Sequence, residues 1–353
     1  MLSTALATSR QKRAALALAI ASLLAFIAVA PFATIPLLEL PAFIPAYEAV
    51  LFFIDLVTAL LLFDQFARVQ TRGLLFLAAA YLFDTLIIIP HALSFPGLFW
   101  PTGLLGAKDQ TTAWLYVFWH GGFAILVLCY SLASRQEIAA AMKPWTRLQV
   151  GWAIAGSMLA MGALTVLLTL FATWGHDLLP VVMEGSNYSL LVKKGVSPAV
   201  WALTLAGLVL LWRREQRVMD LWLMLVMWIW LFDIALSAVI GSNRFDIGFY
   251  AGRLFGLLAS SLLLLSLVRE TVQLHSRALV AAASLEHKLA QFMRAQAMNE
   301  TSTTWKSDES PEMFVHRQNI ARYRSLLKSE ALADEQRHTI ETLLRDEERR
   351  ARD

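Results

Sequence analysis

The sequence predicts an all-α, polytopic transmembrane helix bundle with a cytoplasmic helical tail. Of its 353 residues, 58% are hydrophobic and only 16% are charged, whereas soluble domains carry about 25% charged residues. The charges are unevenly spread. Residues 1–268 hold 16 Lys and Arg and 13 Asp and Glu, and residues 269–353 hold 14 of each. The chain therefore divides into a charge-poor part suited to lipid and a charge-rich tail suited to water.

Eight apolar segments are candidates to cross a membrane, which takes about 20 mostly apolar residues for each helix. They comprise residues 14–31, 46–66, 73–93, 113–133, 149–173, 198–213, 219–241 and 248–268. The sixth is short. The first follows three basic residues and is similar to a signal peptide. Its length, and Pro31 directly after a cleavage-like Ala28-Val29-Ala30, favour a retained helix.

Basic residues in the connections orient this predicted bundle, because Lys and Arg are enriched in cytoplasmic loops. With the N-terminus inside, the inner connections carry eleven Lys and Arg. The outer connections carry four, Lys108, Lys193, Lys194 and Arg244. An even number of spans then returns the C-terminus to the cytoplasm. The net charge of only +3 and the short basic clusters between apolar runs indicate lipid headgroups rather than nucleic acid as the partner.

The tail is predicted to be helical in two parts. Residues 269–298 form a signalling helix with apolar residues at heptad-like spacing, interrupted by His275 and Glu286, so that a coiled coil is one interpretation. Residues 299–312 are a predicted linker and residues 313–353 a helical hairpin, which begins near the N-cap and proline pair Ser310-Pro311.

Ionisable side chains inside spans are costly to bury, so they mark candidate functional residues. A group in the outer halves of spans two to four could line one pocket for a small ligand, a proton or a metal: Asp55, Thr58, Tyr81, Asp84, His91, Trp119 and His120. The histidines would be ligands or proton acceptors, and Asp84 would orient or charge them. Alternatively, these groups hydrogen-bond between helices and fix the bundle. Asp233 and Arg253 reach comparable depth and are predicted to form a structural ion pair.

Enzyme signatures are missing from the sequence. It contains no Gly-rich phosphate loop, no His-Glu-x-x-His and no Gly-x-Ser-x-Gly. Its single cysteine, Cys129, excludes a disulfide within the chain and a cysteine metal site. We therefore expect a protein that is not an enzyme. No catalytic residue and no metal ligand is assigned, and the sequence identifies no cofactor.

Two motifs carry a family resemblance. A Pro-His-x-Leu-x-Phe-Pro-Gly run occupies residues 90–97, and a Trp-Leu-Tyr-x-x-Trp-His run occupies residues 114–120. Together with Leu40-Pro41-Ala42-Phe43-Ile44-Pro45, residues 54–66 and residues 80–83, they resemble the fourth membrane-associated sensor (MASE-type) domain family over roughly residues 15–270. The resemblance implies a membrane input module of a bacterial signalling protein, in the cytoplasmic membrane. It also implies roles in recognition or packing for residues in the matching motifs: Asp55, Thr58, Gln65, Tyr81, His91, Trp119 and His120.

The chain departs from that family's usual pattern, because no diguanylate cyclase or histidine kinase domain follows the membrane part. The first hypothesis is thus a sensor or signalling adaptor that relays a stimulus to a kinase or cyclase encoded separately. A homodimer through the 269–298 helix is compatible with the pattern. The second hypothesis is a transporter, or a haem- or metal-binding intramembrane protein, that uses the Asp/His group. A third is a degenerate fragment of a larger kinase.

Overall fold

The computed structural model describes residues 5–40, 42–139, 145–214, 217–300, 310–328 and 334–351. These residues form helices, and the only extended pairing among them consists of isolated bridges. The predicted all-α fold class is therefore confirmed. Two compact units, residues 1–272 and 273–353, are described separately below.

The first unit contains one helix for each of the eight predicted spans. Within the described residues, seven helices are long and apolar enough to cross a bilayer. Helix α7 has 17 residues, which gives a length of about 25 Å and makes it the short span that the sequence predicted. The bounds are α1 Ser9–Val29, α2 Phe43–Val69, α3 Arg72–Ser94, α4 Thr111–Ala139, α5 Arg147–Thr173, α7 Val196–Trp212, α8 Val218–Ile234 and α9 Ile247–Glu300.

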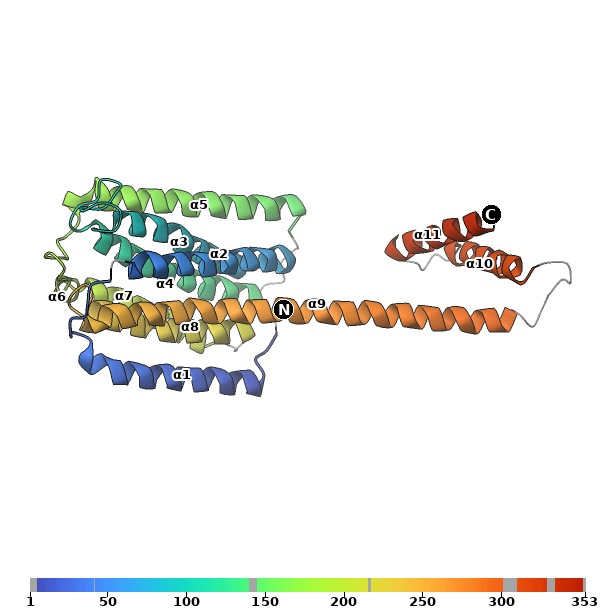
Figure 1. Ribbon diagram of the computed structural model, residues 1–353, viewed down its shortest axis with the longest axis horizontal. Coiled ribbons are helices and arrows are strands. Elements are labelled where there is room, and N and C mark those ends of the chain that lie inside the picture. Colours follow the sequence, from blue (N-terminus) through green and yellow to red (C-terminus); the bar gives the residue numbers. More distant parts are fainter. Residues whose placement is uncertain are drawn as a thin grey trace. The chain divides into compact units, whose positions relative to one another are not determined.

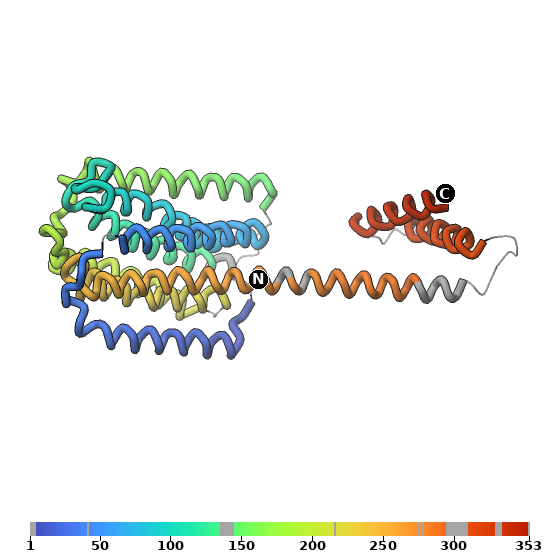
Figure 2. Tube along the Cα trace, in the orientation of Figure 1, coloured from blue at the N-terminus to red at the C-terminus, as the bar shows by residue number. Residues whose placement is uncertain are grey.

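The helices lie side by side, and their connections gather at two opposite ends of the bundle (Figure 1). We call the end with the α3–α4, α5–α7 and α8–α9 connections the loop end. It also holds the short helices η1 (Ala30–Phe32), η2 (His176–Leu178) and α6 (Leu190–Lys193). The opposite end, with the α2–α3 and α7–α8 connections, is the tail end. The trace in Figure 2 follows this alternation from helix to helix.

Helices α3 and α8 form the centre of the bundle. The most apolar 18-residue windows of α3 and α8 are 78% and 72% buried, against 11% in α1 and 6% in α5. Helix α3 packs against α2, α4 and α5, whereas α8 packs against α1 and α7. Ring contacts such as Phe26 with Phe232, 4.7 Å between centroids, join α1 to α8. The outer helices α1 and α5 therefore present most of their apolar surface to the surroundings, as helices in lipid do.

Helix α9 approaches α8 through a row of glycines. Gly248, Gly252 and Gly256 recur every fourth residue and so share one face of the helix. A Cβ atom on Gly252 would lie 2.7 Å from the Ser237 Cβ, and one on Gly256 would lie 2.9 Å from Asp233 Oδ2. Small residues at such positions let two helix backbones approach closely. The polar side chains of α8 consequently lie directly against the backbone of α9.

The second unit contains the end of α9 and a helical hairpin of α10 (Pro311–Leu327) and α11 (Asp334–Arg350). The Ser310 side chain caps α10 by accepting the Met313 N–H at 3.3 Å. Phe314 and Tyr323 are buried in the hairpin, and Arg322 donates to the Met293 carbonyl of α9 at 3.2 Å. Helix α9 extends to Glu300, two residues into the predicted linker 299–312, and residues 301–309 of that linker lie outside the described residues.

We predict that Gly252→Ala destabilises the bundle. The added methyl group would overlap Ser237 and Asp233, and overpacking of this kind costs about 1–3 kcal/mol. Gly156→Ala on α5 is the matched control, because a Cβ there meets no atom within 4 Å and alanine favours the helix by up to about 1 kcal/mol. Thermal unfolding of the purified protein in detergent measures the difference. Equal midpoints for the two variants would contradict the close α8–α9 contact.

Candidate functional site

The residues predicted to form a site are all buried in the first unit, with exposed fractions between 0% and 3%. Trp119 of α4 contacts two of them through its ring. Its ring centroid is 5.7 Å from that of His91 on α3 and 5.2 Å from that of His120 on α4. The structure therefore brings the two histidines of the two sequence motifs within contact distance of one indole ring.

A deeper cluster contains Asp55 of α2, Tyr81 and Asp84 of α3, and the indole N–H of Trp119. Asp84 interacts electrostatically with Asp55, and Tyr81 interacts with both carboxyl groups. Trp119 lies beside Asp84, and Ser260 of α9 lies beside Asp55. These contacts do not meet hydrogen-bond geometry. No hydrogen-bond partner among the described residues is therefore found for the two Asp55 oxygens, the Tyr81 hydroxyl, Asp84 Oδ1 or Trp119 Nε1. Buried polar groups of this kind cost free energy unless water, a proton or a ligand satisfies them.

Thr58 does not join this cluster through its hydroxyl group. Its Oγ1 donates to the Ile54 carbonyl of its own helix at 2.7 Å. This local bond satisfies a buried hydroxyl without any partner from another helix. The sequence had placed Thr58 with the sensing residues, and the structure gives it a contact within α2 instead.

His91 forms a buried pair that the sequence did not reveal. Its Nδ1 lies 2.6 Å from Oε1 of Glu48 on α2, and both side chains are 2–3% exposed. Glu48 stands seven residues before Asp55 and so lies two turns away on the same face of α2. This spacing could have identified it. The predicted second span began at residue 46, which put Glu48 at the headgroup boundary, where a carboxylate is ordinary.

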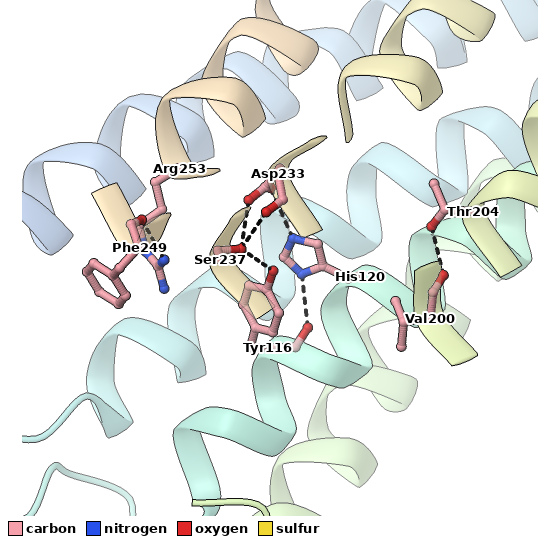
Figure 3. A network of polar contacts seen from close by, with 8 residues as sticks. All are labelled: Tyr116, His120, Val200, Thr204, Asp233, Ser237, Phe249 and Arg253. Atoms are coloured by element: carbon pink, nitrogen blue, oxygen red, sulfur yellow. Dashed lines mark hydrogen bonds and ion pairs between the residues drawn. The ribbon is translucent and has the colours of Figure 1, made fainter. Parts of the chain in front are cut away.

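His120 belongs to a network with Asp233 of α8 and with Ser237, which lies in the segment after α8 (Figure 3). His120 Nε2 lies 3.3 Å from Asp233 Oδ2, and its Nδ1 lies 3.0 Å from the Tyr116 carbonyl oxygen. The Ser237 hydroxyl donates to Asp233 Oδ1 at 3.1 Å and to the Asp233 carbonyl at 2.7 Å. The Tyr116 hydroxyl lies 2.8 Å from that of Ser237. Four polar groups from α4 and the α8 region therefore satisfy one another.

Ser237 lies in a π-helical segment, Ala235–Ile240, which continues α8 toward the loop end. Wider turns of this kind are rare in proteins overall. Where they do occur, they are often found at functional sites. Here the segment begins two residues after Asp233 and contains Ser237, so the irregular backbone and the polar network coincide.

The predicted Asp233–Arg253 ion pair is not formed. Asp233 bonds His120 and Ser237 instead. Arg253 donates to the Phe249 carbonyl at 2.9 Å, and its guanidinium carbon lies 3.5 Å from the centroid of the Phe249 ring. The two residues do border the same small cavity of about 10 Å³, together with Glu48 and His120, which is room for about one water molecule. Equal depth in neighbouring spans correctly placed them near each other but did not specify their partners.

Two further polar contacts lie nearer the tail end and were not predicted. Gln65 of α2 donates to Glu270 of α9 at 2.8 Å. Tyr130 of α4 donates to Asp220 of α8 at 2.6 Å, and Arg214 lies 3.4 Å from the same carboxylate. The family motifs had singled out Gln65, but not its partner. The other groups occur near predicted span ends, where charged residues usually contact water or headgroups, so the sequence gave no reason to expect either contact.

In the described part of the chain, no three His, Cys, Asp or Glu side chains are arranged to hold a metal ion. Both ring nitrogens of His120 already have oxygen neighbours at hydrogen-bond distance, in Tyr116 and Asp233. A haem iron ligated by His120 and His91 would have to displace one of these contacts.

The fold and this buried polar cluster define a multi-pass integral membrane protein with a candidate sensing or transport site within its bundle. A family model described as "MASE4: Membrane-associated sensor, integral membrane domain" matches residues 38–275, more than half of the chain. The chain belongs to this family of membrane-associated sensor domains, which confirms the predicted resemblance. No curated protein and no solved structure matches the chain.

We predict that Glu48→Ala destabilises the protein because it leaves the buried His91 ring nitrogen without its partner, at a cost of about 1–3 kcal/mol. Glu39→Ala, at an exposed glutamate before α2, is the matched control and should leave the unfolding midpoint unchanged. In the double variant Glu48→Ala/His91→Phe, the loss should be smaller than the sum of the single losses. Strict additivity would show that the two side chains do not interact.

Proposed function

We propose that this membrane-associated sensor detects its stimulus at the polar cluster in the loop-end half of the bundle. Helix α9 then carries the response to a separate cytoplasmic signalling protein. One observation carries the proposal. The His120–Asp233–Ser237 network packs against the glycine face of α9 at Gly252 and Gly256. The same α9 continues without a break to Glu300.

The contact between the network and α9 supports a mechanical link. A ligand or proton shifts an equilibrium between two arrangements only if it binds one of them better than the other. A stimulus that changes the partners of His120 or Asp233 changes the position of the Asp233 carboxylate. No side chain on Gly252 or Gly256 separates that carboxylate from α9, so the helix has to adjust. The bond between Gln65 and Glu270 joins the same helix to α2 further along.

The orientation follows from the basic residues. We place the tail end in the cytoplasm and the loop end outside a bacterial cytoplasmic membrane, with both termini in the cytoplasm. The imbalance of eleven Lys and Arg to four between the two sides supports this orientation. The exposed apolar surfaces of α1 and α5 would then contact membrane lipid.

The tail supports an output by contact rather than by catalysis. The sequence shows no catalytic motif, and the described tail residues form α9, α10 and α11 only. Large apolar side chains on the α9 part of this unit are exposed, including Leu279, Leu285, Leu289 and Phe292 at 51–66%. We propose that these residues bind a kinase or cyclase encoded separately, and that the same helix can also pair with a second copy of the chain in a coiled-coil dimer. In this proposal the chain is not itself an enzyme and binds no nucleic acid.

The experiment is site-specific photo-crosslinking in living bacteria that express the full-length chain. A photoreactive amino acid at Leu289 should cross-link to a kinase or cyclase, identified by mass spectrometry. The yield should change at least about twofold when Asp233→Asn alters the buried network, because a shift of that size needs only a few tenths of a kcal/mol. The same amino acid at Leu159, an exposed residue on α5, is the control and should capture neither enzyme.

Two results would contradict the proposal. One is the absence of any kinase or cyclase among the products from Leu289 and from its exposed neighbours Leu285 and Phe292. The other is a yield that stays constant in Asp233→Asn, which would separate the buried network from the tail.

A further inference from the structure

A second, larger cavity lies at the loop end. Its volume is about 40 Å³, and it lies beneath the connections that precede α7 and α9. The polar residues that matter for its chemistry are His91, Tyr116, Tyr188, Ser237, Arg244 and Arg253. Tyr116 and Ser237 belong to the network that contacts α9, so an occupant of this cavity would lie next to that network.

The cavity is lined by two arginines and by no carboxylate. Arg244 donates to the sulfur of Met183 at 3.5 Å, and its guanidinium carbon lies 4.8 Å from the centroid of the Phe95 ring. Arg253 donates to the Phe249 carbonyl and lies over the ring of the same residue. Arg253 is buried and Arg244 is partly buried. A cation withdrawn from water normally has an anionic partner, and neither guanidinium forms an ion pair with a carboxylate of the described residues.

The nearby acids already have other partners. Asp246 accepts the backbone N–H groups of Ser242, Asn243 and Phe249 at 2.7–3.0 Å and so caps the start of α9. Asp233 and Glu48 are bonded to the two histidines, and they border the smaller cavity, which Arg253 also lines. No nearby carboxylate of the described residues is therefore left to balance the positive charge of Arg244. Burial, and next the charge of Arg253, lower the pKa of Arg244 from 12.5 to about 10.

Tyr188 supplies an unused donor. Its side chain is 6% exposed, and its hydroxyl has no hydrogen-bond partner among the described residues. Burial, with a smaller contribution from Asp246, raises the pKa of Tyr188 above its usual value, so the hydroxyl keeps its proton at neutral pH. A buried donor without an acceptor is rare in proteins. The cavity thus combines two guanidinium groups and one free hydroxyl.

We propose that this cavity binds a small planar oxyanion, of the carboxylate or nitrate type, between Arg244, Arg253 and the Tyr188 hydroxyl. The planar fork of a guanidinium matches two oxygens of such an anion. A volume of about 40 Å³ holds about three water-sized probes, which limits the ligand to a few non-hydrogen atoms. This inference rests on the proposed function, because it names the ligand class of the same sensing site.

The test uses the full-length protein purified in detergent at fixed ionic strength, with sodium formate, nitrate or chloride as the probe. Formate or nitrate should raise the unfolding midpoint in a saturable way, as binding to the folded state does, and chloride should do so less. Comparing the apparent affinities for formate and nitrate shows whether the cavity prefers a carboxylate or an inorganic oxyanion. Arg244→Gln should weaken the apparent affinity by about tenfold or more, the effect of losing a charge-assisted hydrogen bond.

Lys193→Gln is the matched control, since it removes an exposed positive charge at the same end of the bundle and should leave the affinity within about twofold. Arg244→Lys covers the case in which the glutamine variant does not fold. It keeps the charge but loses the planar fork, so the preference for formate and nitrate over chloride should disappear.

Equal stabilisation by all three salts, or stabilisation that survives unchanged in Arg244→Gln or Arg244→Lys, would overturn the anion site. Failure of the site and failure of the relay are distinguishable. Anion binding is measured by unfolding alone, and the relay is measured by the Leu289 cross-link. A protein that binds no anion but whose cross-link responds to Asp233→Asn would lack the site and keep the relay.

Discussion

A polar side chain buried within a membrane bundle has to find its partner inside the protein, because lipid offers none. This constraint determines which helices of the bundle are bonded to one another through side chains. Glu48 with His91 joins α2 to α3, His120 with Asp233 joins α4 to α8, and Gln65 joins α2 to α9. Apolar surface alone would not choose these neighbours, since lipid tails are as apolar as the side chains they would replace. The polar pairs therefore specify which helices meet, and the groups left unpaired mark where a ligand or a proton can act.

Helix α9 combines close packing against α8 with the proposed relay. Its glycine face allows α8 to approach so closely that Asp233 lies against backbone rather than side chain. The bundle part of this helix and its extension to Glu300 are one continuous element. A sensor needs a change in its site to alter an element that other proteins can contact, and a helix couples its two ends better than a flexible loop. The π-helical segment after Asp233 adds a backbone irregularity at the same place.

Much of this could be read from the sequence, for identifiable reasons. Long apolar runs predicted the spans, and burial of all seven site candidates followed from their depth. The hydrogen-bond partner of each buried polar side chain could not be predicted, because it depends on how each helix is rotated and on which helices are neighbours. Glu48 and Asp220 were overlooked since they stand near span ends, where acids usually meet water. Arg253 was assigned to Asp233 on depth alone, whereas it contacts the carbonyl and the ring of Phe249.

If the buried network controls the position of α9, as we propose, a change in the network moves α9 relative to α2, and a distance measurement within the bundle detects this movement. Spin labels at the exposed residues Leu60 of α2 and Leu265 of α9, in a chain carrying Cys129→Ser, report this position by pulsed electron resonance. Asp233→Asn should shift or broaden the distance distribution, whereas Asp64→Asn, at an exposed ion pair, should not. Superimposable distributions for the labelled parent and Asp233→Asn would show that the network does not control the position of α9.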